Sequence, residues 1–282
     1  MEGINLENLD NNDLGRFFEE GKRYFEKGDF VLAEKYLKKA TKSGNREAFL
    51  LLFDIFLKDD RTNIAEKYLK PLADGGDFEF QNKLGEVYRK KANFELAEYY
   101  FKLAIGNGNK KAHYNLGKLY YEYKKNNLAT ENLKIAADEY DDKKAQKKLV
   151  DYYKDNLTLR KHYLSLLADK NNLDAFVKLG DIFTQEKNYG LAFSNYNNFF
   201  NATSHLKEKP TFYMDRIDKE KLKFNYGKSC ISLGKFDIAE ECFKENKYLC
   251  ENENIIEVAK LYESANQFKN AIEYYKLALH IQ

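Results

Sequence analysis

Apolar side chains recur every three or four positions along almost the whole chain, in runs that short polar stretches separate. One run contains Leu84 and Val87, and the next extends from Phe94 to Ala104. This spacing places the apolar side chains on one face of an α-helix. The polar residues between the two runs, at positions 90–93, predict a tight turn, so the pattern indicates a pair of antiparallel helices.

The helix pair repeats at an interval of 32 residues. A glycine followed three positions later by tyrosine marks the first helix at Gly21, Gly85 and Gly117, and the separations are 64 (85 − 21) and 32 (117 − 85). Alanine keeps the same interval in the second helix, at Ala33, Ala65, Ala97 and Ala129. A fixed interval of this length is typical of stacked repeats. The sequence therefore predicts an all-α solenoid of about eight antiparallel helix pairs with a period of 32.

Two irregularities interrupt the interval. The fifth unit keeps Leu149 and Tyr152 in frame and is then one residue short, because Gly180 follows Gly117 by 63 residues (180 − 117). Before the seventh unit, Gly227 follows Gly180 by 47 residues (227 − 180), which adds 15 residues (47 − 32). The predicted organisation is a lead-in at 1–12, repeats one to six at 13–201, an insertion or extended helix at 202–218, and repeats seven and eight at 219–282.

The insertion contains Pro210, and proline can start a helix. The segment is therefore either an ordinary surface loop or an extension of the first helix of repeat seven. In the second case it would form a bend or joint between repeats one to six and the last two.

The residues at the ends of the predicted helices favour the same organisation. Asp29, Asn93 and Asp237 precede second helices and are expected to cap them. Glycine at the boundary between units can take the left-handed conformation that ends a helix. The boundary residues are Gly44, Gly76, Gly108 and Tyr140, followed by Asn45, Asp77, Asn109 and Asp141.

Small residues are expected where the two helices of a pair cross. Gly85 on the first helix and Ala97 on the second would allow the two axes to approach closely, and Tyr88 would fill the space beside them. Each pair then has an apolar face that only its neighbour can cover.

In residue type and spacing, Gly85, Tyr88, Ala97, Phe101 and Ala104 match the tetratricopeptide repeat, which the chain resembles over nearly its whole length. The interval of 32 differs from the usual 34, and Gly-Asn or Gly-Asp replaces the boundary proline. The alanine-rich helix ends followed by glycine resemble the Sel-one-like (Sel1-like) repeat. The resemblance implies a right-handed solenoid that acts as a scaffold or adaptor for other proteins.

Residues typical of catalysis or of cofactor binding do not gather in the sequence. The four histidines fall in different units without the spacing of metal ligands, and no glycine loop resembles a phosphate site. The three cysteines, Cys230, Cys242 and Cys250, are expected to be free buried thiols. We therefore predict no catalytic residue, no metal and no cofactor.

The balance of charges excludes an electrostatic preference for nucleic acid or an anionic membrane, because 47 basic and 45 acidic residues give a net charge of +2. The N-terminus lacks the features of a signal peptide, and no stretch has the roughly 18 apolar residues of a membrane span. The expected location is the cytoplasm. The richness in Asn, Lys and Tyr favours a bacterial source.

A partner-binding groove is predicted along the first helices, which line the concave side in the family that the chain resembles. The expected groove residues of repeats one to four are Phe18, Lys22, Phe25, Leu50, Asp54, Leu57, Asn82, Glu86, Arg89, Tyr114, Lys118 and Tyr121. The corresponding residues of later repeats are Gln146, Val150, Tyr153, Val177, Asp181, Phe224, Lys228 and Ile231. Apolar anchors of a helical or extended peptide could bind such a surface. The alternative is that several of these residues belong to the core between helices. The lysine and asparagine clamp that some family members use for C-terminal carboxylates is not found in the sequence.

The second helix of repeat eight is a further candidate surface, because Ala271, Tyr275 and Ala278 are expected to be partly open. Terminal repeats normally need a polar outer face. We therefore expect self-association or a docked partner there. For the protein as a whole, the predicted function is a non-enzymatic scaffold or adaptor that binds a protein or peptide. The alternatives are a ligand- or peptide-sensing regulator and a structural subunit of a larger assembly.

Overall fold

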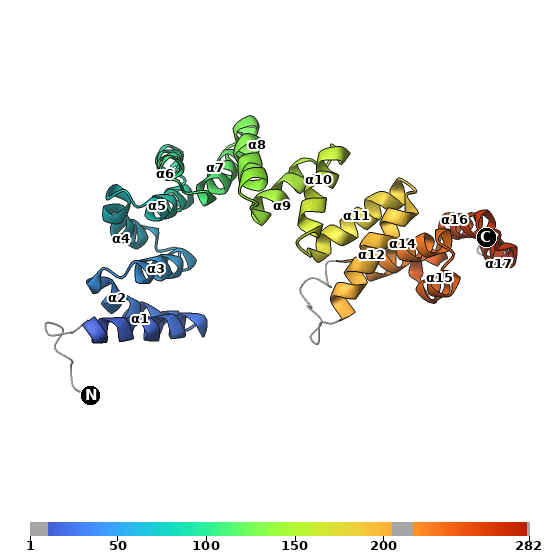
Figure 1. Ribbon diagram of the computed structural model, residues 1–282, viewed down its shortest axis with the longest axis horizontal. Coiled ribbons are helices and arrows are strands. Elements are labelled where there is room, and N and C mark those ends of the chain that lie inside the picture. Colours follow the sequence, from blue (N-terminus) through green and yellow to red (C-terminus); the bar gives the residue numbers. More distant parts are fainter. Residues whose placement is uncertain (1–10, 205–216, 281–282) are drawn as a thin grey trace. The chain divides into compact units, whose positions relative to one another are not determined.

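The structure is a computed structural model that describes residues 11–204 and 217–280. Within these residues the chain forms sixteen α-helices and no β-strand. Figure 1 labels the helices in order along the chain. The first eight are α1 (Asn11–Glu26), α2 (Phe30–Ala40), α3 (Arg46–Lys58), α4 (Thr62–Asp74), α5 (Phe78–Lys90), α6 (Phe94–Gly106), α7 (Lys111–Glu122) and α8 (Asn126–Lys134). The others are α9 (Lys143–Tyr152), α10 (Leu157–Ala168), α11 (Leu173–Gln185), α12 (Tyr189–Ser204), α14 (Lys219–Ser232), α15 (Phe236–Phe243), α16 (Asn252–Ser264) and α17 (Phe268–His280).

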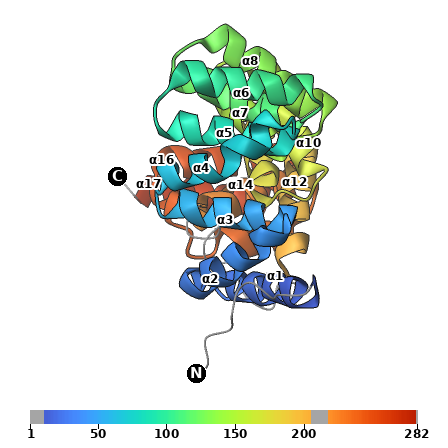
Figure 2. The same cartoon turned by 90° about the vertical axis from the view of Figure 1, so that its left-hand side faces the viewer.

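The helices are arranged as consecutive pairs. In all pairs except α9 and α10, the first helix packs on its own second helix, and α3, α5, α7, α11, α14 and α16 also pack on the preceding pair. Figure 2 shows α1 and α2 side by side as the first of these pairs. The pairs cluster into two compact units, Met1–Ala145 and Gln146–Gln282, and the division falls within α9. The predicted all-α solenoid of antiparallel helix pairs is thereby confirmed.

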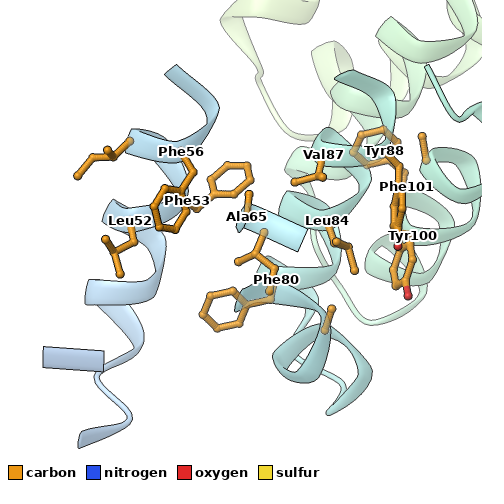
Figure 3. Packing of buried hydrophobic residues seen from close by; sticks show 14 of the residues in the cluster. Leu52, Phe53, Phe56, Ala65, Phe80, Leu84, Val87, Tyr88, Tyr100 and Phe101 are labelled. Atoms are coloured by element: carbon orange, nitrogen blue, oxygen red, sulfur yellow. The ribbon is translucent and has the colours of Figure 1, made fainter. Parts of the chain in front are cut away.

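The crossing of the two helices in a pair depends on small residues, as the sequence predicts. A Cβ atom added to Gly85 would lie 2.6 Å from Cδ1 of Phe101 on α6. Figure 3 shows Phe101 close beside Tyr88 in this core. Added Cβ atoms would meet the second helix in the same way at Gly21, Gly117 and Gly227. Ala97 is completely buried.

Two of the three predicted caps of second helices are confirmed. The side chains of Asp29 and Asn93 accept hydrogen bonds from the backbone N–H groups of Leu32 and Leu96, both at 3.1 Å. Asp237 is not a cap, because it lies inside the first turn of α15 and Lys235 precedes that helix. The position of the turn explains the difference. In each of these pairs the residue with positive φ comes directly before the cap position of the second helix. In repeat seven that residue is Gly234 (φ 72°), so the cap position falls on Lys235.

The boundary glycines adopt the left-handed conformation that was predicted, with φ of 74° at Gly44, 92° at Gly76 and 94° at Gly108. The fourth boundary differs from the prediction. There a π-helical turn at Ile135–Glu139 adds one residue, since π-helical turns are wider than α-helical ones. As a result Asp141, not Tyr140, has the positive φ (55°). The next residue, Asp142, caps α9 by accepting from the N–H groups of Lys144 and Ala145.

Repeat five is therefore out of the predicted register. Its two caps, Asp142 and Asn156, are 14 residues apart (156 − 142), whereas Asp77 and Asn93 of repeat three are 16 apart (93 − 77). The boundary before repeat five has one residue more than the others, and its helix pair has two fewer. Together they make the repeat interval one residue shorter. The prediction that Leu149 and Tyr152 keep the frame is wrong, because the residues equivalent to Gly85 and Tyr88 are Val150 and Tyr153. Tyr153 stacks on Tyr163 at an interplanar angle of 5°, as Tyr88 stacks on Tyr100 at 14°.

The predicted insertion lies mostly outside the described residues. The structure describes α12 to Ser204 and resumes before α14, which Asp218 caps through the N–H groups of Glu220 and Lys221. Pro210 and the predicted joint fall between them, so both remain predictions. Among the cysteines, Cys230 and Cys242 are buried as expected, but Cys250 is exposed because it ends a short 3-10 turn on the surface.

Candidate partner-binding groove

Five of the six groove residues predicted in repeats three and four line one cavity. The cavity has a volume of about 590 Å³ and lies against α5, α7 and the first turn of α9. The five residues are Asn82, Glu86, Arg89, Tyr114 and Lys118. The sixth, Tyr121, is 49% exposed and does not line the cavity. The other residues that line the cavity are Glu79, Lys83, Asn109, Lys111, Asn115, Asp142, Lys143 and Lys144. We call this cavity the α5–α7 groove.

The floor of the α5–α7 groove is a network of amide and carboxylate groups. Nδ2 of Asn115 donates to Oδ1 of Asn82 at 2.9 Å and to Oε1 of Glu86 at 3.1 Å. Asn82 is buried, so its side chain is held in place by packing as well as by this bond. Arg89 forms an ion pair with Glu122 at 2.8 Å, which joins α5 to α7 on the other side. The floor is therefore fixed by bonds between the two helices.

Cationic side chains outnumber anionic ones around the groove. The six cations are Lys83, Arg89, Lys111, Lys118, Lys143 and Lys144, and the three anions are Glu79, Glu86 and Asp142. The anions are all engaged: Glu79 pairs with Arg46 at 2.8 Å, Glu86 accepts from Asn115, and Asp142 caps α9. Of the cations, the side chains of Lys111, Lys143 and Lys144 form no hydrogen bond or ion pair with any described residue. The groove thus has an excess of positive charge.

Tyr114 forms the aromatic part of the wall and is half-buried. Burial, opposed in part by nearby Arg89, raises the pKa of its hydroxyl above the ordinary value. The hydroxyl therefore stays protonated at neutral pH and can donate a hydrogen bond to a ligand.

The two helices that carry the groove are held to their neighbours by a recurring contact. The hydroxyl of Tyr88 on α5 donates to Glu66 on α4 at 2.9 Å, and that of Tyr120 on α7 donates to Glu98 on α6 at 2.7 Å. Lys91 also pairs with Glu66. The hydrogen bond from Lys91, followed by that from Tyr88, lowers the pKa of Glu66 although burial opposes the change. Burial and the bond to Glu98 raise the pKa of Tyr120 to about 12.

In repeats one and two, the predicted groove residues behave differently. Phe18 is buried and is not a surface residue, because it belongs to the hydrophobic core cluster of the first repeats. Phe25, Leu50 and Leu57 are half-buried and pack against the same core. Lys22 is exposed, and Asp54 is exposed and pairs with Lys83 at 3.0 Å.

In the later repeats most of the predicted groove residues belong to the core, which was the alternative. The register shift of repeat five buries Gln146 and Val150. Val177, Phe224, Lys228 and Ile231 are also buried, and Lys228 pairs with Glu257 at 2.9 Å. Asp181 accepts from Tyr196 at 2.7 Å and from Asn225 at 2.9 Å. These side chains join helices to one another.

Sequence reasoning missed Asn115 and the lysines at 111, 143 and 144. Asn115 directly follows the predicted Tyr114, and its role depends on the facing Asn82, which a spacing rule within one helix does not detect. Lys143 and Lys144 reach the groove only because the π-helical turn sets where α9 begins.

No group of His, Cys, Asp or Glu suited to a metal ion occurs among residues 11–204 and 217–280. In the same residues no helix is both long and apolar enough to cross a membrane. The residues that line the α5–α7 groove offer hydrogen bonds, charge and one aromatic ring.

The family model of the tetratricopeptide repeat matches residues 255–282, which include most of α16 and α17. None of the curated proteins matches the chain in sequence. Among solved structures, the chain is similar to a protective antigen of uropathogenic Escherichia coli strains that displays an SLR fold, with 16% identity and a TM-score of 0.49. That similarity covers 95% of this chain, which spans only 65% of the antigen.

Two other solved structures are similar over shorter parts of the chain. A Sel1 repeat protein from Oxalobacter formigenes has 19% identity and a TM-score of 0.46, and the match covers 61% of this chain and 79% of that protein. The C-terminal part of a tetratricopeptide repeat-containing protein from Cytophaga hutchinsonii has 16% identity and a TM-score of 0.46. It covers 82% of this chain and 94% of that one.

Proposed function

We propose that the chain binds a partner protein in the α5–α7 groove. Its described residues form consecutive helix pairs, and the last pair matches the model of the tetratricopeptide repeat, a fold commonly used as a protein–protein interaction scaffold. The bound part of the partner is an acidic segment in extended conformation. The function needs no catalytic step.

The charge of the groove is the observation that carries the proposal. Three lysines at its rim, Lys111, Lys143 and Lys144, have no partner in the described chain, while the carboxylates nearby are already bonded. A carboxylate of the partner could therefore pair with these lysines without displacing an existing ion pair. Such exposed pairs are worth about 0.2–1 kcal/mol each, so several together are needed for useful affinity.

The amide groups of the floor favour a peptide as the ligand. The side chain of Asn115 and that of Asn82 together offer donors and an acceptor, and a peptide backbone offers both kinds of partner. The Nδ2 group of Asn82 makes no hydrogen bond with a described residue, so it can donate to a peptide carbonyl. Tyr114 can pack against an apolar side chain beside the acidic ones.

The proposal can be tested with a fluorescein-labelled peptide in which glutamate alternates with serine. Fluorescence anisotropy would measure its binding to the full chain at increasing salt concentration. We expect saturable binding that weakens as salt screens the charges, and no binding of the matching glutamine–serine peptide. In the Lys143→Glu/Lys144→Glu double variant the affinity should fall by about tenfold or more, which corresponds to about 1.4 kcal/mol.

A matched control separates the groove from the net charge of the protein. Lys35→Glu/Lys67→Glu reverses the same number of charges at exposed positions of α2 and α4. Its affinity for the acidic peptide should remain within about twofold of the original. Equal losses in the two double variants would contradict the proposal. Tyr114→Ala provides a second check, since it should weaken binding while the melting temperature changes little.

A further inference from the structure

A cavity of about 630 Å³ lies between α10, α11 and α12, and we call it the α10–α12 pocket. Three apolar residues of α11 line it: Phe176 and Leu179, which are buried, and Phe183, which is half-buried. Polar side chains lie around them, among them Asp169 after α10 and two asparagines of α12. The pocket thus combines an apolar surface with hydrogen-bonding groups.

In five other repeats a tyrosine of the second helix packs on a ring near the end of the first helix. In repeat three, Tyr100 stacks on Tyr88 with ring centroids 5.5 Å apart. The other pairs, with centroids between 5.5 and 6.0 Å apart, are Tyr36 on Tyr24, Tyr68 on Phe56, Tyr163 on Tyr153 and Tyr274 on Tyr262.

Repeat six has an asparagine instead of this tyrosine. Tyr196 lies against the crossing glycine as Phe101 does in repeat three, so the residues directly before them, Asn195 and Tyr100, are equivalent. Nδ2 of Asn195 donates to the backbone oxygen of Leu191 at 2.8 Å, one turn earlier in α12. This short side chain therefore bonds to its own helix and leaves the pocket open.

The ring that the tyrosine would cover is Phe183, the equivalent of Tyr88. Phe183 lines the α10–α12 pocket. The ammonium group of Lys161 lies 5.6 Å from the centre of its ring, and no second ring of the described chain contacts it. An aromatic ring from outside could therefore pack on Phe183, as the tyrosines do in the other repeats.

The pocket also contains an acceptor for a tyrosine hydroxyl. In repeat three, Tyr100 donates to Oδ1 of Asp74 on the preceding second helix at 3.3 Å. Asp74 follows the core residue Leu69 by five positions (74 − 69), and Asp169 follows the equivalent Leu164 by the same number (169 − 164). Asp169 lines the pocket, and its carboxylate forms no hydrogen bond or ion pair with a described residue.

Repeat eight shows the same use of a carboxylate. The hydroxyl of Tyr274 on α17 donates to Glu240 of the preceding second helix, α15, at 3.1 Å. In the same helix, Ala271 and Ala278 were expected to be partly open, but both are buried because α17 packs on α16. A tyrosine that joins one second helix to the one before it therefore recurs in this fold.

We infer that the α10–α12 pocket binds the side chain of a tyrosine residue that a partner protein presents. The phenol ring packs on Phe183 and its hydroxyl donates to Asp169, so the partner supplies the two contacts that Tyr100 makes in repeat three. The side-chain amide of Asn198 and Oδ1 of Asn195 form no hydrogen bond with a described residue. Both can bond to the backbone of the partner beside its tyrosine.

Saturation-transfer NMR with the full chain tests the inference. The probe is the peptide Gly-Ser-Tyr-Ser-Gly, blocked at both ends so that it carries no charge, and matched peptides have Phe or Ala in place of Tyr. We expect the strongest saturation at the ring protons of tyrosine. The Phe peptide should bind about fivefold or more weakly, because it offers Asp169 no hydroxyl, and the Ala peptide should not bind.

Asn195→Tyr gives repeat six the tyrosine of the other repeats. It should abolish binding of the Tyr peptide, while the melting temperature stays the same or rises because the new ring fills the pocket. Ser194→Tyr is the matched control, since it adds the same side chain at the neighbouring exposed position, where repeat three has the exposed Tyr99. Its affinity for the Tyr peptide should stay within about twofold of the original.

Asp169→Ala tests the acceptor separately from the ring. The affinity for the Tyr peptide should fall to that for the Phe peptide, and the affinity for the Phe peptide should not change. A preference for the Tyr peptide that persists in this variant would contradict the role of Asp169.

Three further results would overturn the inference. They are no saturation of the Tyr peptide, equal affinities of the original chain for the Tyr and Phe peptides, and binding that survives Asn195→Tyr. The acidic peptide should bind the Asn195→Tyr variant with unchanged affinity, and Lys143→Glu/Lys144→Glu should bind the Tyr peptide normally. The failure of the α10–α12 pocket and that of the α5–α7 groove are therefore distinguishable.

Discussion

Repeats three and five build the same helix pair with different residues at the point where the two helices cross. Repeat three places Gly85 opposite Phe101 and keeps a completely buried alanine, Ala97, at the fourth residue after the cap. Repeat five has Val150 on its first helix and Arg160 at the fourth residue after Asn156. All other repeats have alanine at this position: Ala33, Ala65, Ala129, Ala192, Ala239 and Ala271.

This difference between repeats three and five determines where the α5–α7 groove can form. In repeats three and four the close crossing leaves Asn82, Glu86 and Lys118 at the open side. In repeat five the pair is two residues shorter, and the residues expected at the open side, Gln146 and Val150, are buried instead. The α5–α7 groove therefore ends at the first turn of α9.

The largest effect is expected when repeat three is given the arginine of repeat five. Ala97→Arg introduces a large charged side chain into a completely buried position. The free energy of unfolding should fall by about 3 kcal/mol or more, from overpacking and an unpaired buried charge. Urea unfolding followed by circular dichroism measures it. An unchanged midpoint would show that the register of the repeats is wrong.

The next substitution gives repeat three the valine of repeat five. In Gly85→Val the new Cβ would lie 2.6 Å from the buried ring of Phe101, so the ring or one of the two helices must shift. We expect a loss of about 1–3 kcal/mol in the free energy of unfolding. Phe101→Leu in the same background should recover part of it, because leucine is smaller than phenylalanine and repeat five has Leu164 at the position equivalent to Phe101. No recovery would mean that the two residues are not in contact.

The contact of Glu66 with Lys91 and Tyr88 predicts an effect of pH. Its pKa in the folded protein lies below the ordinary 4.5, so the ionised carboxylate stabilises the fold at neutral pH. This contribution is fully present above about pH 4.5 and is lost as the pH falls through the lower folded pKa. Glu66→Gln should therefore be less stable than the original at pH 7, and the difference should shrink toward pH 3. A difference that is the same at all pH values would exclude this role.

The smallest effect is expected for the reverse exchange, Arg160→Ala. The Nε group of Arg160 is buried and has no hydrogen-bond partner within the described chain. Its removal relieves a cost of about 1–3 kcal/mol, while the loss of packing by the aliphatic stem acts in the opposite direction. The free energy of unfolding should stay within about 1 kcal/mol of the original or rise. A loss as large as that of Ala97→Arg would show that Arg160 has a structural partner.

Much of this architecture could be predicted from the sequence because the repeat depends on local rules. Gly85 and Ala97 identify the helix crossing, and Asp29 and Asn93 identify helix starts, each within one pair. The register of repeat five could not be predicted, because a wider turn near Asp141 and a shorter pair nearly cancel in the residue count. The cap of α15 was misplaced because the turn residue is Gly234, and spacing alone pointed to Asp237.

The groove was predicted only in part for a related reason. Asn82, Glu86 and Arg89 follow from the geometry of a single helix. The bond between Asn115 and Asn82 and the approach of Lys143 and Lys144 depend on how neighbouring pairs are placed. Phe18 was wrongly expected at the surface. Its spacing from the residues that pack between the helices is the same as that of exposed groove residues in other repeats, and only the packing of the core shows that Phe18 is buried.

Photochemical cross-linking tests the central claim, that the α5–α7 groove binds an acidic segment, most directly. The Tyr114→p-benzoylphenylalanine variant would be irradiated with the labelled glutamate–serine peptide. A matched variant, Tyr99→p-benzoylphenylalanine, carries the same group at a 56% exposed position of α6, away from the groove. The account predicts cross-linking at position 114 that Lys143→Glu/Lys144→Glu removes, and little at position 99. Equal cross-linking from both positions, or none from position 114, would contradict it.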